Sequence, residues 1–191
     1  MNLQRRVILL GTIALPFVPL AARMLPGSAM VSNRTEPPVL VLQSGLPESE
    51  RFAHSWGSRS SGVINFEGDT SVLLYERLVP MWRERGATAV AGLTSVSSCF
   101  CVSQVAADHG LRVLHRGVHR PLHGRIQHEI EGSPSTADVT PADWPSRTAR
   151  IAMQAMDRVG ERRALSQFEL LPQSELAFAS WLMVPRSWLA A

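Results

Sequence analysis

Four of the six histidines in this chain fall in one short stretch, LHRGVHRPLHGRIQHE, from Leu114 to Glu129. Imidazole nitrogens bind Zn²⁺ or Cu²⁺ and exchange protons near neutral pH, so this stretch is the first candidate for chemistry. A helix would align three of the histidines at every fourth residue, but Gly117 and Pro121 interrupt helical structure. The pattern therefore predicts a β-hairpin with its turn at Pro121–Gly124.

Alternate residues of a strand point to the same side of a sheet, and this alternation assigns the hairpin side chains to faces. The first strand is expected to place one set of residues on one face: Val113, His115, Gly117 and His119. The second strand is expected to place another set on a shared face: Ile126, His128 and Ile130. Pairing across the turn then brings His119 and His128 to the same side of the sheet.

Two hypotheses follow for these histidines. One is a metal-dependent enzyme in which His115, His119 and His128 bind Zn²⁺ or Cu²⁺, which requires a further ligand because two imidazoles make an incomplete site. The other is a structural or partner-facing hairpin that holds no cofactor. Its opposite face would carry cross-strand charges: Arg116, Arg120, Arg125, Glu129 and Glu131. We expect the second.

Hydroxyl and carboxylate side chains also follow three expected strands, in the loops QSGLPES, FEGDTS and GLTSVSS. In a parallel sheet these loops meet at one edge, beside helix N-termini that offer free N–H groups. The candidate ligand-binding residues are Ser44, Asp69, Thr70, Thr94 and Ser95. They could hold a small polar or anionic ligand, or they could simply cap the helices that follow. A serine hydrolase that pairs Ser97 or Ser98 with a histidine is a further alternative, although the chain has no GxSxG motif.

The two cysteines, Cys99 and Cys101, are two residues apart and do not form a CxxC motif. On a helix this spacing points the thiols to nearly opposite sides, which disfavours a disulfide between them. We expect both to be free, buried, small apolar side chains.

Apolar strands alternate with helices that end at glycine over the first two thirds of the chain. The expected strands are VLVLQ, VINF, AVAGL and RVLHRGV, adjacent and parallel. This pattern predicts a three-layer α/β domain, Rossmann-like or flavodoxin-like, with a mostly parallel sheet and an antiparallel edge hairpin. A helix from Asp143 to Gly160 follows, and Pro80 is expected to kink the helix that contains it. The apolar C-terminal thirty residues would pack across the sheet edge or form a strand and a terminal turn.

The N-terminus has the layout of an export signal, with Arg5 and Arg6 before an apolar run and small residues at its end. The paired arginines resemble a twin-arginine (Tat) signal, although Gln4 stands where Ser or Thr is usual; the general secretory route is the alternative. We expect residues 1–29 to be a cleaved signal peptide, or else an uncleaved anchor that provides the chain's one membrane contact. Residues 30–38 would be a linker and residues 39–191 one domain, in the periplasm or outside the cell.

Charge argues against a nucleic-acid partner. All nineteen basic residues are arginine, and removing the three in the first 29 residues leaves sixteen, against sixteen acidic residues. The mature body is therefore close to neutral, without the basic stripe that nucleic-acid binding needs. We expect an exported, non-catalytic binding or accessory protein, because Tat export of folded proteins resembles the behaviour of accessory subunits that travel with an enzyme. Its partner would be a small molecule or another protein.

Overall fold

A computed structural model of the chain describes residues 36–122, 125–131, 143–159 and 177–189. All of them belong to the compact unit Arg34–Ala191. The export signal expected at residues 1–29 and most of the expected linker lie outside the described residues. No helix among the described residues has the length and apolar character needed to cross a membrane.

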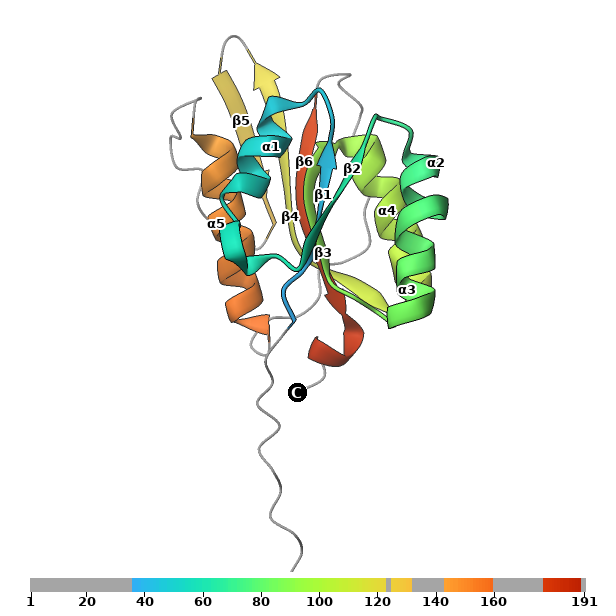
Figure 1. The fold of residues 1–191 in the computed structure, drawn as a ribbon. Helices are drawn as coiled ribbons and strands as arrows, with labels where there is room; N and C mark the ends of the chain where they lie inside the picture. Colours follow the sequence, from blue (N-terminus) through green and yellow to red (C-terminus); the bar gives the residue numbers. More distant parts are fainter. Residues whose placement is uncertain (1–35, 123–124, 132–142, 160–176, 190–191) are drawn as a thin grey trace, which may run out of the picture. The chain divides into compact units, whose positions relative to one another are not determined.

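The described part alternates strands and helices in its first half, as the sequence predicts (Figure 1). The strands are β1 Val39–Gln43, β2 Gly62–Phe66, β3 Val90–Ser95, β4 Leu111–Leu122, β5 Arg125–Ile130 and β6 Phe178–Pro185. The helices are α1 Pro47–His54, α2 Thr70–Val72, α3 Val79–Arg85, α4 Val96–Asp108 and α5 Trp144–Asp157. A π-helical segment, Leu73–Leu78, joins α2 to α3, and 3₁₀ turns cover Gly57–Arg59 and Arg186–Leu189.

The six strands form one open mixed sheet with the order β2-β1-β3-β6-β4-β5. Strands β2, β1 and β3 are adjacent and parallel, as predicted. The expectation of a mostly parallel sheet is wrong, because the pairs β3–β6, β6–β4 and β4–β5 are all antiparallel. Strand β6 lies between β3 and β4, so β4 does not adjoin β3. The apolar C-terminal segment does form a strand, but at the centre of the sheet and not at its edge.

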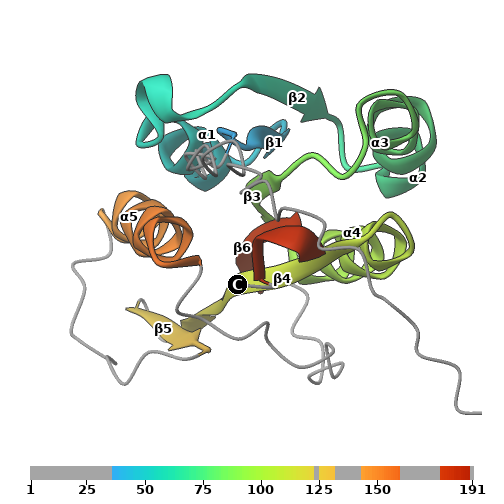
Figure 2. The same ribbon diagram turned by 90° about the horizontal axis from the view of Figure 1, so that it is seen from below.

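Helices cover both faces of the sheet (Figure 2). On one face, the π-helical segment, α3 and α4 pack on side chains that include Val41, Val90 and Trp181. On the other face, α1 and α5 pack on Leu40, Ala91 and Leu182. Consecutive strand residues therefore alternate between two separate cores, which explains why these strands are apolar along their whole length.

The helix that contains Pro80 changes geometry next to this residue. Proline has no N–H for the carbonyl four residues earlier, so a regular helical hydrogen bond is lost there. The π-helical segment ends two residues before Pro80, and the N–H of Val79 bonds the carbonyl of Leu74, five residues back. The predicted local disturbance thus takes the form of a wider helical turn.

Candidate functional site

The carboxyl ends of β1 and β3 mark the point where the chain changes sides of the sheet. After β1 the chain enters α1, which packs on the Leu40 face, and after β3 it enters α4, which packs on the Val41 face. In doubly wound sheets, ligands bind where the helices that follow two adjacent parallel strands leave toward opposite faces. The side chain of Gln43 spans this point, because its Oε1 accepts a hydrogen bond from the backbone N–H of Ser95 at 2.8 Å.

A network of hydroxyl groups lies at the N-terminus of α4, beside this point. Ser95 caps the helix by accepting a hydrogen bond from the N–H of Ser98 at 3.2 Å, and the two hydroxyls are 2.9 Å apart. The hydroxyl of Ser97 lies 3.1 Å from that of Ser95, and the hydroxyl of Thr70 lies 2.8 Å from that of Ser98. The loops that follow β2 and β3 are thus linked through four hydroxyls.

The five residues predicted for this site are only partly brought together. Thr70 and Ser95 meet through Ser98, and Asp69 is the exposed cap of α2, accepting from the N–H of Ser71 at 2.8 Å. Ser44 is exposed, and its backbone N–H bonds the carbonyl of Phe66. Thr94 is fully buried, and it accepts a hydrogen bond from Nε1 of Trp181 at 3.1 Å, away from the other hydroxyls.

Gln43 and Ser98 also belong to this site, although the sequence pattern does not single them out for it. Ser98 was considered only as a possible hydrolase nucleophile, although it stands three residues after a serine at a helix start, a spacing that favours capping contacts. Gln43 is the last residue of an apolar strand, and a polar residue at a strand end is too common to single out.

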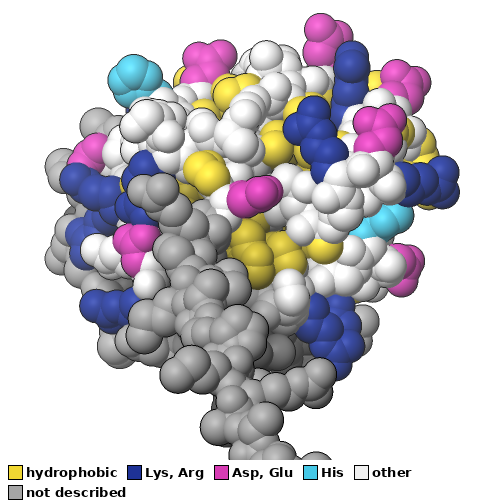
Figure 3. All heavy atoms as spheres, turned by 60° about the horizontal axis from the view of Figure 1, so that its bottom comes forward, with side chains coloured by type: hydrophobic (Ala, Val, Ile, Leu, Met, Phe, Trp, Pro, Cys, Tyr) yellow, Lys and Arg dark blue, Asp and Glu magenta, His cyan; other side chains and the backbone are white. Residues whose placement is uncertain are grey.

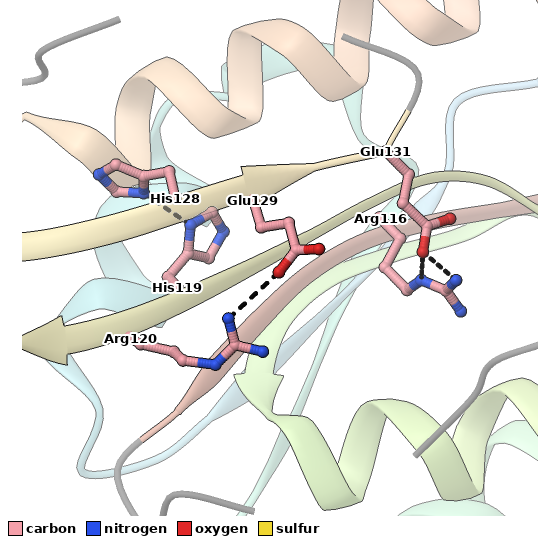
Figure 4. A network of polar contacts seen from close by, with 6 residues as sticks. All are labelled: Arg116, His119, Arg120, His128, Glu129 and Glu131. Atoms are coloured by element: carbon pink, nitrogen blue, oxygen red, sulfur yellow. Dashed lines mark hydrogen bonds and ion pairs between the residues drawn. The ribbon is translucent and has the colours of Figure 1, made fainter. Parts of the chain in front are cut away.

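The histidine stretch forms the predicted hairpin of β4 and β5 (Figure 4). His119 lies directly opposite His128 in the ladder, and their Nδ1 atoms are 2.8 Å apart, so their predicted position on one face is confirmed. The predicted turn is too long at its first end, because β4 continues to Leu122 and Pro121 pairs with Ile126. Pro121 is accommodated since the pairing with β6 already ends at His119. His123 and Gly124 lie outside the described residues.

A bulge in β4 changes the predicted face of one residue. The pairing with β6 shifts between Val113 and His115, so Val113 pairs with Met183 and packs in the α3–α4 core. Leu114 packs in the opposite core, and His115 pairs with Leu182, which belongs to that same core. Val113 and His115 therefore do not share a face, because the extra residue inverts the alternation.

Ser180 of β6 completes a buried polar chain with the histidines. Its Oγ lies 2.9 Å from Nε2 of His119 and 3.3 Å from Nε2 of His115. Gly117 makes room for this arrangement, because a Cβ there would lie 2.8 Å from Ser180 Oγ and 3.1 Å from Cε1 of His119. Ser180 was not predicted for this site, although it is the sole hydroxyl residue in the run FASWLMVP.

Trp144, at the start of α5, closes this cluster. Its ring centroid lies 4.5 Å from that of His119 and 5.5 Å from that of His128. Burial lowers the pKa of His119 well below its usual value, and neighbouring His128 and His115 lower it further. Burial also lowers the pKa of His128, with a smaller effect from the Arg147 guanidinium. Both imidazoles are therefore neutral at pH 7.

The opposite face of the hairpin carries the predicted cross-strand charges (Figure 4). Arg116 is buried and donates from Nε to Glu131 Oε1 at 2.8 Å, and Arg120 pairs with Glu129 at 3.1 Å. The side chain of Arg125 lies outside the described residues. These pairs join the arginines of β4 to Glu129 of β5 and to Glu131, the residue after β5, and so help to hold the two strands in register.

The cluster can be compared with two kinds of reactive centre. Within the described ranges, no three His, Cys, Asp or Glu side chains are grouped to hold a metal ion. The order Ser180, His119, His128 matches that of a hydrolase triad, in which Nε2 of the histidine faces the serine and Nδ1 faces a third group. However, Ser180 and His119 are both fully buried, so in this structure a substrate carbonyl cannot reach the hydroxyl.

The cysteines are both free, as expected, and differ in exposure. Cys99 is buried, and burial raises the pKa of its thiol to about 12. Cys101 is exposed, which contradicts the expectation that both are buried.

The described part of the chain thus holds two polar clusters of different chemistry. One consists of hydroxyls and an amide at the carboxyl ends of parallel strands, and the other of neutral imidazoles around Ser180. Comparison of the chain with protein-family models, with curated proteins and with solved structures finds no match.

Proposed function

We propose that this chain is an exported, non-catalytic protein that binds a small polar or anionic ligand at the carboxyl ends of β1 and β3. One observation carries the proposal: α1, the helix after β1, and α4, the helix after β3, pack on opposite faces of the sheet. In Rossmann-like and flavodoxin-like proteins, ligands bind at such a point. We infer that the β2-β1-β3 half of the sheet belongs to this general type.

The chemistry of the cluster favours a ligand that both donates and accepts hydrogen bonds. The hydroxyls of Thr70, Ser95 and Ser97 do both, and buried Ser98 holds Thr70 and Ser95 in place. The N-terminus of the thirteen-residue α4 favours negative charge. The exposed carboxylate of Asp69 accepts hydrogen bonds, so it suits a ligand that also carries O–H or N–H groups. A bound ligand would form hydrogen bonds with these hydroxyls in place of their contacts with one another. No covalent step is needed.

NMR titration of the ¹⁵N-labelled protein tests the proposal with defined probes: inorganic phosphate, sulfate, adenosine monophosphate, glucose and glycine. We expect at least one probe to shift the amides of residues 95–98 in a saturable manner. A Ser98→Ala, Thr70→Val variant should lose this response, whereas the exposed control Ser58→Ala should keep it. Saturable shifts elsewhere, or shifts that persist in the double variant, would contradict the assignment of the site.

Export and an accessory role are the second part of the proposal. N-terminal sequencing of the exported protein should find a new terminus near Met30, and intact Met1 in the membrane fraction would indicate an anchor instead. Replacing Arg5 and Arg6 by Lys should block export if the route is Tat. In that case the protein would travel folded, as accessory subunits of exported enzymes do.

A serine hydrolase is the second candidate function, favoured by the distances from Ser180 to His119 and from His119 to His128. It requires α5 to move, because Trp144 packs against both imidazoles. A fluorophosphonate probe distinguishes the two functions. Labelling that disappears in Ser180→Ala, but not in Ser98→Ala, would establish the hydrolase and refute the non-catalytic proposal.

A further inference from the structure

Strand β2 forms an open edge of the sheet. It pairs with β1 on one side, and no strand among the described residues pairs with its other side. The carbonyl of Phe66 accepts a hydrogen bond from Ser44 N–H on the β1 side, so the N–H and C=O of Asn65, one residue earlier, point outward. Val63 shares this outward orientation, and its side chain is 54% exposed.

This edge lacks the features that usually prevent strands from pairing between molecules. Proteins protect edge strands with charged residues, proline or bulges. The other edge strand, β5, carries Arg125 and Glu129, whereas β2 has the uncharged sequence GVINF. The β2 edge is therefore suited to receive another strand.

A groove of about 420 Å³ runs beside β2, between this strand and the helix formed by the π-helical segment and α3. Its apolar lining includes Ile64, Pro80 and Met81, and its charged lining consists of Glu76, Arg77, Glu84 and Arg85. None of these four charged side chains forms an ion pair with another described residue. Across the face shown in Figure 3, side chains of both signs are likewise mixed and do not form a field of one sign.

The order of these charges identifies the occupant. The Glu76–Arg77 pair and the Glu84–Arg85 pair are about 12 Å apart along the helix. A two-fold axis perpendicular to the sheet would pair β2 antiparallel with β2 of a second copy, and would place the two α3 helices side by side and antiparallel. Arg77 and Glu84 both line the groove and are seven residues apart, so they lie on the same side of the helix. The two-fold axis then brings Glu84 of each copy to Arg77 of the other. Such a self-complementary surface is what a two-fold dimer requires.

We propose that this chain forms a symmetric homodimer through the β2 edge and the adjoining groove, producing a continuous sheet across two copies. The proposal does not depend on the small-ligand site, which lies at the carboxyl ends of β1 and β3. The dimer satisfies the outward backbone groups of Val63 and Asn65 and covers Ile64 and Met81 with the second copy. The partner is therefore a second copy of this chain and not an unrelated peptide.

Sedimentation velocity of the full chain tests the proposal, and we expect twice the mass of one chain. Asn65→Pro removes an outward N–H while the pairing with β1 is retained, so this variant should be monomeric, whereas the control Asn65→Ala should dimerise. A circular dichroism spectrum equal to that of the parent shows that the proline variant is folded.

Charge reversal gives a second test that does not alter the strand. Glu84→Arg places two arginines opposite each other in both directions, and Arg77→Glu does the same with two glutamates. Each single variant should raise the dimer dissociation constant about tenfold or more. An equimolar mixture of the two variants restores opposite charges at both contacts, so it should dimerise.

Three outcomes would overturn the proposal: a monomer at every concentration, a dimer that survives both Asn65→Pro and Glu84→Arg, or a mixture of the reversed variants that stays monomeric. The first of these outcomes includes a monomer that binds an extended peptide of another protein along β2.

Discussion

Replacing Gly117 by alanine tests whether this residue holds the buried His119–Ser180 contact in place. A Cβ at this position would lie 2.8 Å from Ser180 Oγ and 3.1 and 3.2 Å from two ring atoms of His119. Crowding of this kind in a packed interior costs about 1–3 kcal/mol. If Ser180 rotates away, the buried imidazole nitrogens lose their partner, which costs about 1–3 kcal/mol more.

One effect opposes this loss. Alanine restricts the unfolded chain more than glycine does and favours the strand by about 0.5–1 kcal/mol. The net expectation is that Gly117→Ala lowers the free energy of unfolding by about 3 kcal/mol. At a typical urea m-value this moves the midpoint by roughly 1–2 M. Urea unfolding followed by tryptophan fluorescence measures the shift.

Two comparisons make this test specific. Gly62→Ala is the matched control, because Gly62 also lies in a strand and a Cβ there has nothing within 4 Å, so its stability should stay within about 0.5 kcal/mol of the parent. Ser180→Ala removes the hydroxyl that the new Cβ would meet. The Gly117→Ala, Ser180→Ala double variant should therefore cost at least about 1 kcal/mol less than the sum of the single variants. A Gly117→Ala variant as stable as Gly62→Ala, or strictly additive losses, would refute the reasoning.

Three other measurements follow from the described geometry. Gly92→Ala should be more damaging than Gly117→Ala in the same urea assay, because its Cβ would lie 2.7 Å from the Trp181 ring and 2.8 Å from the backbone carbonyl of Val41, which cannot rotate away. A maleimide should modify one thiol, Cys101, in the native protein, while Cys99 reacts after denaturation; equal native rates would contradict this. Because folding lowers the pKa of His119, the unfolded state binds more protons below about pH 6.5. Stability should therefore fall on acidification below that pH, by up to about 1.4 kcal/mol per pH unit for this residue. A flat profile in pH-dependent urea unfolding would contradict this expectation.

Local sequence pattern was sufficient to predict the first half of the sheet. Strands β1, β2 and β3 are short apolar runs separated by helices, and right-handed crossovers between such units leave few topologies, so their adjacent, parallel arrangement could be predicted. The histidine hairpin was predictable for a similar reason, since the partners His119 and His128 are close in the chain and strict alternation fixes their common face.

The centre of the sheet was not predictable in the same way. The FASWLMVP run of β6, apolar except for Ser180, indicates burial on both faces, but it does not say which strands lie on either side. Pairing between segments far apart in the chain depends on how their side chains fit together, and the spacing of apolar residues along the sequence does not reveal this fit. The bulge at Leu114 shows the same limit on a smaller scale. One additional residue in the strand places Val113 in the other core, and nothing in the residue types of this strand indicates a bulge.

The side-chain fit that positions β6 can be identified in the structure. Trp181 pairs with Gly92 of β3, and the next residue toward the N-terminus, Ser180, pairs with Gly117 of β4. The two glycines thus lie on the two strands that flank β6, and each gives space to one large or hydrogen-bonded side chain, on opposite faces of the sheet. A slip of β6 by one residue would turn Ser180 toward the α3–α4 core and Trp181 toward the histidines. The hydroxyl would then lose both imidazoles, and the indole would meet the packed ring of Trp144. The two glycines therefore select a single register for β6, and this register is what brings Ser180 to His119.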